Sequence, residues 1–186
     1  MIIFIHGFGS NGLGSKACQL RAYCALNKIP FLAPSLSTIP VLAISTLEEL
    51  IEQCLNFQPI RLIGSSLGGY YALYLAQKYQ LSAVLINPSM EPEVTLQRHR
   101  GKACNYFDGS GYEWTAEHLA SLKHYRTDST GKNTLLLVQT GDEVLDYQVA
   151  VNRLPDAETI VVPGGNHGFE GFDSYLEKTM TFLQIK

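Results

Sequence analysis

The stretch Ile63-Gly64-Ser65-Ser66-Leu67-Gly68-Gly69 decides the fold class that the sequence predicts. It joins an apolar run, 60–63, to residues 67–79, which are apolar almost all round. The first segment is typical of a buried strand and the second of a buried central helix. Small residues two positions before and after Ser66 leave room for a tight strand-to-helix turn. Such a turn lifts the Ser66 hydroxyl off the end of the strand, although glycines can also simply ease a turn without any chemical role.

Short apolar runs alternate with helical patterns along the rest of the chain. Further strands are expected at 2–5, 31–33, 83–86, 134–139 and 159–162, and helices at 15–28, 47–55 and 172–183. Ser15 is the expected N-cap of the first helix. The alternation predicts the α/β class, with a mainly parallel sheet of about six strands and helices on both faces. Because the apolar runs are nearly continuous, each strand is expected to be buried on both faces.

Length and composition fit one ordered domain, 1–186. The chain has 186 residues, 46% of them hydrophobic and 17% charged, which suits a single globular domain. A net charge of −3 without a run of Lys or Arg argues against a nucleic-acid surface. The apolar stretches are far shorter than the ~18 residues of a spanning helix, and no basic region precedes the first of them, so neither a membrane segment nor a signal peptide is expected.

Residues 88–133 interrupt the alternation and read as an insertion after the fourth strand. The segment carries two prolines, four glycines and the aromatics Tyr106, Phe107, Tyr112 and Trp114, and a short helix is expected near 115–123. Connections of this length are uncommon unless they are functional or separately folded. The insertion is therefore either a cap that takes part in binding or a surface excursion without such a role.

Three patterns could suggest a cofactor or a metal, but each lacks a feature that such a site requires. The stretch 7–12 spells the dinucleotide fingerprint, but the acidic residue needed about 20 positions later is missing, since the first acidic residue is Glu48. The stretch 9–16 ends in Ser-Lys, the reverse of the order in a phosphate-binding loop. The four cysteines lack zinc spacing. No cofactor and no metal are expected.

An acid and a histidine follow Ser66 at matching places in the chain. Asp142 comes just after the run 134–139, and His167 just after 159–162. The carboxyl ends of parallel strands meet at one rim of a sheet, so all three side chains are expected there. A serine hydroxyl needs a base to take its proton, and the chain order serine, acid, histidine is the one used by hydrolases that carry a G-x-S-x-G turn. The sequence thus predicts a catalytic triad of Ser66, Asp142 and His167.

Other assignments within this set stay open. Asp142 can instead cap a helix, with Asp146 or Glu143 as the acid. His6 is expected to brace the loop after the first strand, and the histidines of the insertion, His99, His118 and His124, are expected to be solvated.

An oxyanion hole would complete the predicted site. One donor in such sites is the N–H of the residue after the nucleophile, and the other comes from the loop after an early strand. These are Leu67 and Phe8 here. The glycines around Phe8 would let its amide approach a substrate closely.

Four stretches resemble the YqiA-like esterases, a bacterial branch of the α/β-hydrolase superfamily. They are His6-Gly7-Phe8, GSSLGGYY at 64–71, QTGDEVLDY at 139–147 and GGNH at 164–167. The resemblance spans nearly the whole chain and implies a compact α/β-hydrolase fold. It also implies a cytoplasmic enzyme that cleaves simple carboxylic esters, with acyl-CoA thioesters as a further expectation. The family's nucleophile, acid and base fall on Ser66, Asp142 and His167.

Two other classes of function remain compatible with the sequence, because fold and triad do not fix a substrate. One is a binding or scaffold protein on a hydrolase fold without turnover. The other is a different chemistry of the same triad, such as hydrolysis of a C–C bond. The expected partner is a small ester or thioester, and the sequence leaves the oligomeric state open.

Overall fold

The computed structural model describes residues 1–106 and 108–185, so Phe107 of the insertion lies outside the described residues. A six-stranded sheet with the order β2-β1-β3-β4-β7-β8 forms its centre. All five neighbouring pairs in this sheet are parallel. The strands are β1 (Ile2–Ile5), β2 (Phe31–Leu32), β3 (Arg61–Ser65), β4 (Ala83–Ile86), β7 (Thr134–Gln139) and β8 (Glu158–Val162).

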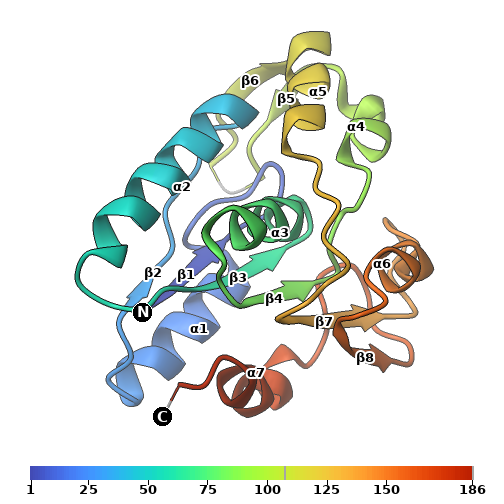
Figure 1. The fold of residues 1–186 in the computed structure, drawn as a ribbon. Coiled ribbons are helices and arrows are strands. Elements are labelled where there is room, and N and C mark those ends of the chain that lie inside the picture. The colour runs from blue at the N-terminus through green and yellow to red at the C-terminus, as the bar shows by residue number, and fades with distance from the viewer. Residues whose placement is uncertain (107, 186) are drawn as a thin grey trace.

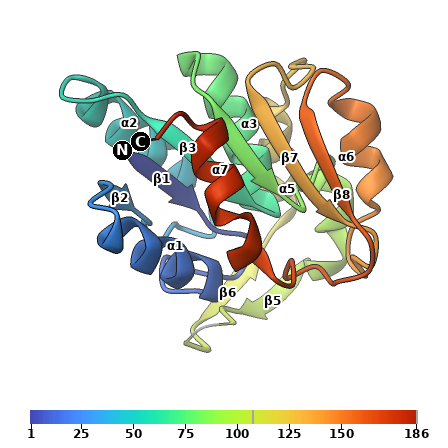
Figure 2. The same ribbon diagram turned by 90° about the horizontal axis from the view of Figure 1, so that it is seen from below.

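Helices cover both faces of the sheet, as the sequence predicts (Figure 1). On one face lie α2 (Pro40–Leu55), α3 (Leu67–Tyr79) and α6 (Tyr147–Arg153). On the other lie α1 (Ser15–Leu26) and α7 (Leu176–Phe182), which stand in front of the strands in Figure 2. A short 3-10 turn, η3 (Phe172–Tyr175), leads into α7. None of the helices in the described chain is long and apolar enough to span a membrane.

The central strands carry continuous apolar runs because both of their faces are covered. Ile3 and Ile5 of β1 belong to the hydrophobic cluster under α2 and α3. Ile2 and Phe4 belong to the cluster under α1 and α7, as the two-residue period of a strand requires. The prediction that every strand is buried on both faces is wrong at the edges of the sheet. In β8, Ile160 packs on the second cluster, but Val161 is 43% exposed, because an edge strand has a neighbour on one side only.

One predicted helix cap and one predicted helix start differ from the structure. Ser15 is the first residue of α1, and its N-cap is Gly14, which makes no side-chain capping bond. The predicted cap at Ser15 is therefore wrong by one residue. The helix α2 begins at Pro40, a residue type favoured in the first helical turn because it lacks an N–H that would be unpaired there. The bounds of α3 agree with the prediction.

The described part of the insertion holds two short α-helices, two 3-10 helices and a β-hairpin. Its elements are α4 (Pro92–Thr95), η1 (Gln97–His99), β5 (Gly101–Cys104), β6 (Gly111–Trp114), α5 (Ala116–Leu122) and η2 (Lys123–Tyr125). The expected helix is present as α5, capped by Thr115. The hairpin is absent from the prediction because Gly-Lys-Ala-Cys has little strand propensity. Trp114, with no exposed surface, anchors it in the core. Figure 2 shows the hairpin beyond the carboxyl ends of the strands.

Candidate active site

Ser66 occupies a strained turn between β3 and α3. Its φ of 55° is positive, a region that costs residues other than glycine of order 1–3 kcal/mol. Close packing fixes the turn: a Cβ added at Gly64 would lie 2.2 Å from the Gly68 oxygen, and one added at Gly68 would lie 2.1 Å from the Ile5 oxygen. The two glycines of the predicted turn are thus required by close approach to backbone.

His167 lies between Ser66 and Asp142. Its Nε2 is 3.0 Å from Ser66 Oγ, and its Nδ1 is 2.8 Å from Asp142 Oδ2 and 3.0 Å from Oδ1. With a proton on Nδ1, the imidazole donates to the carboxylate and accepts from the serine hydroxyl. The structure thus brings together the three side chains that the sequence selects from the ends of β3, β7 and β8.

The surroundings of Asp142 favour its ionised form. Its side chain is 2% exposed, against 22% for His167. Burial raises the pKa of this carboxyl, but the hydrogen bond to His167 and those from the Leu145 and Val144 amides outweigh burial and hold the pKa below its usual range. Both amides donate to Oδ1 over 2.9 Å. The carboxylate is therefore positioned and charged.

The other two candidate acids have different contacts. Asp146 is the N-cap of α6 and accepts from the Gln148 amide at 2.9 Å. Glu143 accepts the backbone N–H of His167 at 3.0 Å through Oε2. Of these three acids, Asp142 has the contact with the His167 ring.

Two buried amide side chains that the sequence reasoning missed hold the His167 loop. Asn87 follows β4 and donates through Nδ2 to the carbonyls of Asn166 and His167, at 3.1 and 3.2 Å, while its Oδ1 accepts from the Gln139 amide. The Gln139 side chain bonds Asn166 and Glu170 across the same loop. Both are 2% exposed. The signal available in the sequence was a polar residue at the end of each apolar run.

The predicted oxyanion donors flank Ser66. Phe8 and Leu67 line the same cavity as Ser66 and His167. Within the described residues, neither of their backbone N–H groups donates a hydrogen bond. Gly7 lets the loop after β1 approach Ser66 closely, since a Cβ added at Gly7 would lie 3.1 Å from Ser66 Cβ. Two unpaired donors are thus available next to the serine.

His6 braces this loop from behind, as the sequence indicates. Its Nδ1 lies 2.8 Å from the Gly7 carbonyl, and its Nε2 accepts the Leu36 amide at 2.9 Å. This pattern requires the neutral ring with its proton on Nδ1. Burial lowers the pKa of His6 and outweighs the bond to Gly7, so the neutral form is the favoured one.

A cavity of about 250 Å³ opens beside Ser66. Its walls are largely apolar and come from the insertion, the first loop and the segment after β7. The lining residues are Phe8, Ser66, Leu67, Ser89, Thr95, Leu96, Arg98, His99, Tyr106, Val144, Leu145 and His167.

Two of the three insertion histidines, His99 and His118, are less exposed than expected. His99 is partly buried and packs on Phe8, with ring centroids 5.4 Å apart. His118 is partly buried beside Trp114 and accepts the Thr115 amide. His124 is exposed as expected. In residues 1–106 and 108–185, no group of three or more His, Cys, Asp or Glu side chains is placed to hold a metal ion.

Comparison with known proteins gives the family and the fold. The model of the uncharacterised protein family UPF0227 matches residues 1–184. A UPF0227 protein of Vibrio cholerae serotype O1 is 25% identical over 188 residues, covering 98% of each chain.

Solved structures similar to this chain include α/β hydrolases. Alpha/beta hydrolase domain-containing protein 10 from mouse has a TM-score of 0.70 at 20% identity, over 97% of this chain and 87% of that one. The esterase domain of a Rhodothermus marinus protein has a TM-score of 0.69 at 15% identity, over 98% and 84%. At these identities the likeness establishes the architecture alone. The chain belongs to the uncharacterised protein family UPF0227, the YqiA-like family, and has the α/β-hydrolase fold.

Proposed function

We propose that this protein is a serine esterase that hydrolyses carboxylic esters through an acyl-enzyme intermediate. The observation that carries the proposal is the contact chain from Ser66 Oγ through His167 to the Asp142 carboxylate, with spacings of 3.0 and 2.8 Å. It has the geometry of a nucleophile, a base and the group that orients the base. Among structures with this fold, one is an esterase domain, which agrees with the proposal.

In the first half of the reaction, Ser66 Oγ attacks the acyl carbonyl while His167 Nε2 takes the hydroxyl proton. Asp142 keeps the imidazole in the required tautomer and stabilises the imidazolium. The carbonyl oxygen becomes an oxyanion and accepts from the Phe8 and Leu67 amides. Leu67 is the first residue of α3, so the positive end of the helix dipole adds to this stabilisation. Collapse of the intermediate breaks the ester bond, and the imidazolium gives its proton to the leaving alcohol.

Water completes the cycle. His167 removes a proton from a water molecule that attacks the acyl-Ser66 carbonyl, and the second oxyanion uses the same two amides. Its collapse releases the acid and returns the proton to Ser66 Oγ. A thiol leaves by the same route as an alcohol, so thioesters are included in the proposed substrate class.

The insertion is proposed to act as a cap of a single domain, 1–186. Residues Thr95, Leu96 and Tyr106 of the 88–133 segment line the cavity beside Ser66. A space of about 250 Å³ falls below the roughly 300–1,000 Å³ of drug-sized ligand sites, which favours short acyl groups. The cytoplasmic location implied by the family resemblance stays a prediction.

A panel of p-nitrophenyl esters from acetate to octanoate tests the proposal. We expect the wild type to hydrolyse the short esters and Ser66→Ala to lose about 10⁴-fold or more in kcat, since the nucleophile is removed. Ser65→Ala is the matched control, because Ser65 is the neighbouring buried serine and does not line the cavity. Absence of hydrolysis of every ester would favour a non-catalytic role or C–C bond chemistry, and equal rates for wild type and Ser66→Ala would exclude Ser66 as nucleophile.

A further inference from the structure

The cavity beside Ser66 has one formal charge that the proposed chemistry does not use. Arg98 of η1 lines it, and none of the other described lining residues is a carboxylate. Arg98 is an exposed residue at the cavity, so solvent stabilises its charge until an anionic group of a bound ligand replaces that solvent.

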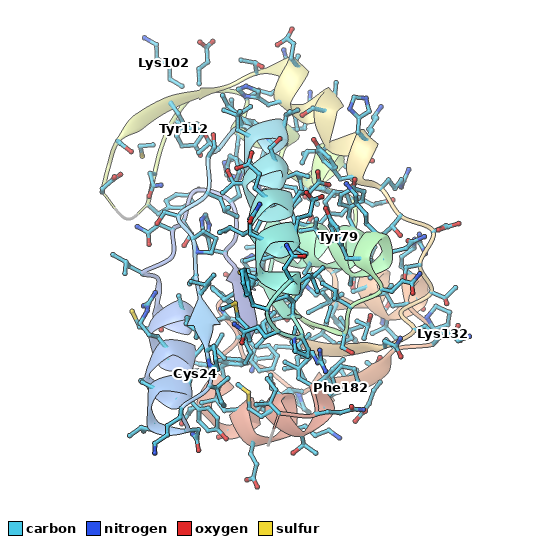
Figure 3. The ribbon with its side chains drawn as sticks, turned by 60° about the vertical axis from the view of Figure 1, so that its left-hand side comes forward. Cys24, Tyr79, Lys102, Tyr112, Lys132 and Phe182 are labelled. Atoms are coloured by element: carbon cyan, nitrogen blue, oxygen red, sulfur yellow. The ribbon has the colours of Figure 1, made fainter. Side chains whose placement is uncertain are left out.

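In the part of the chain that the structure describes, Arg98 also has no acidic partner. No described carboxylate forms an ion pair with it. Arg126, from the same insertion, lies 3.6 Å from Glu91 and 3.9 Å from Glu93. Lys102 faces Glu113 across the hairpin register and projects away from the body of the molecule in Figure 3. Of the basic side chains described in this region, Arg98 is thus the one that lines the cavity and has no ion pair with a described carboxylate.

The guanidinium of Arg98 is oriented by its neighbour. Its Nε donates to His99 Nε2 over 3.3 Å, and the His99 ring packs on Phe8. Burial and the nearby Arg98 charge lower the pKa of His99, so this ring acts as a neutral acceptor. Within the described residues, neither terminal nitrogen of Arg98 donates a hydrogen bond, and a planar fork of this kind matches a carboxylate or a phosphate bidentately.

We propose that Arg98 forms an anion subsite of the cavity, so that the preferred ester or thioester carries a carboxylate or phosphate group. This inference rests on the proposed esterase function and narrows its substrate class. The anion belongs either to the acyl group or to the leaving group, and the two sources are distinguished by substrate pairs of matched shape.

Two pairs of substrates test the subsite. For the acyl side they are p-nitrophenyl hydrogen glutarate and its methyl-capped diester. For the leaving-group side they are the S-butyryl thioesters of phosphopantetheine and pantetheine. In one pair we expect kcat/KM of the anionic member to exceed that of the neutral member by about 10-fold to 100-fold, the range for a hydrogen bond to a charged group.

Variants of Arg98 and Arg100 test whether Arg98 causes the preference for the anionic substrate. Arg98→Gln should bring the anionic-to-neutral ratio close to one, mainly through KM, and Arg98→Lys should restore part of it. Arg100→Gln, an exposed arginine outside the cavity lining, should leave the ratio unchanged. A ratio near one in both pairs for the wild type, or a ratio unaffected by Arg98→Gln, would overturn the subsite.

Failure of the subsite and failure of the esterase proposal give different results. Hydrolysis of the neutral members and of p-nitrophenyl butyrate reports on the esterase alone. If none is hydrolysed, calorimetric titration of Ser66→Ala with the same four compounds still measures the anion preference in binding. Tighter binding of an anionic member, lost on adding Arg98→Gln, would support the subsite without turnover. Equal binding within both pairs would reject it.

Discussion

Two residues of the candidate site have energetically unfavourable features: Ser66 has a strained backbone conformation, and Asp142 has a buried carboxylate. Ser66 keeps a positive φ of 55°, and its main chain is held by bonds from its N–H to Ile86 and from the Gly69 N–H to its carbonyl. Asp142 is almost fully buried yet accepts from two backbone amides as well as from His167. Such costs are typical of sites where a group must keep one orientation and one charge.

Asp142→Asn tests the orienting acid. The amide is isosteric but cannot stabilise the imidazolium and favours the wrong imidazole tautomer, so we expect kcat for p-nitrophenyl butyrate to fall by about 10⁴-fold. Asp146→Asn is the matched control, because asparagine caps a helix as well as aspartate does. Since the cap of α6 is kept, the activity of this variant should stay within about twofold of the wild type. Comparable losses in both variants would reassign the acid.

Among the elements, the loop after β8 depends on side chains from two other strands. Asn87 at the end of β4 and Gln139 at the end of β7 bond the backbone of this loop around His167. His167 is therefore positioned by the sheet rim and not by its own loop alone.

Asn87→Ala measures this contribution. It leaves two carbonyls and the Gln139 N–H without their partner, and each buried unpaired group costs about 1–3 kcal/mol. We expect the free energy of unfolding in urea to fall by at least this amount, and kcat to fall by about 10–100-fold as His167 is misplaced.

Asn133→Ala is the control for the backbone strain at Asn87. Asn133 also has a positive φ, 58° against 40° at Asn87, but it is exposed and its side chain makes no hydrogen bond within the described residues. Equal destabilisation in the two variants would mean that Asn87 contributes only its backbone conformation.

The loop after β1 should respond to pH through His6. The pKa of His6 is lowered by burial, so below about pH 6.5, the ordinary imidazole value, the unfolded chain takes up this proton before the folded chain does. The free energy of unfolding therefore falls as the pH drops below 6.5, and the loss levels off under the folded pKa. His6→Gln should flatten the decline of Tm between pH 7 and 5 relative to wild type, while His124→Gln at an exposed site should not. An identical decline in His6→Gln would contradict this account of the loop.

Across the whole molecule, the insertion meets the sheet rim where the strand ends converge. The Tyr106 amide donates to the Gly9 carbonyl at 2.8 Å, which ties the hairpin to the first loop. Leu96 closes another side of the cavity. Under the proposed function, the insertion would therefore limit substrate size, while the reacting groups would come from the ends of the sheet strands.

Leu96→Ala tests this division of roles. Removing the side chain enlarges the cavity, so we expect kcat/KM for p-nitrophenyl hexanoate to rise relative to acetate by about 10-fold, as for one or two methylenes in an apolar pocket. Val94→Ala, in α4 but 64% exposed and outside the lining, should leave the ratio unchanged. A chain-length profile that is identical in Leu96→Ala and wild type would remove the insertion from substrate selection.

The sequence predicts correctly those elements whose bounds depend on neighbouring residues, and it misses features that depend on contacts between distant segments. The bounds of β1, β4, β7 and α3 agree with the predicted ones because continuous apolar runs and a glycine-flanked turn mark them. The hairpin of the insertion depends on Trp114 reaching the core, which no short window of sequence shows. Asn87 and Gln139 were missed for the same reason, since their roles exist only once β4, β7 and the His167 loop are adjacent.

The most direct test of the central claim is the intact mass of the protein after exposure to a fluorophosphonate. Such a reagent reacts with a serine that a neighbouring base activates beside oxyanion donors. We expect one adduct per chain on the wild type and on Ser65→Ala, and none on Ser66→Ala. A wild type that gains no adduct, or a Ser66→Ala protein that gains the same adduct, would contradict the assignment of Ser66 as an activated nucleophile.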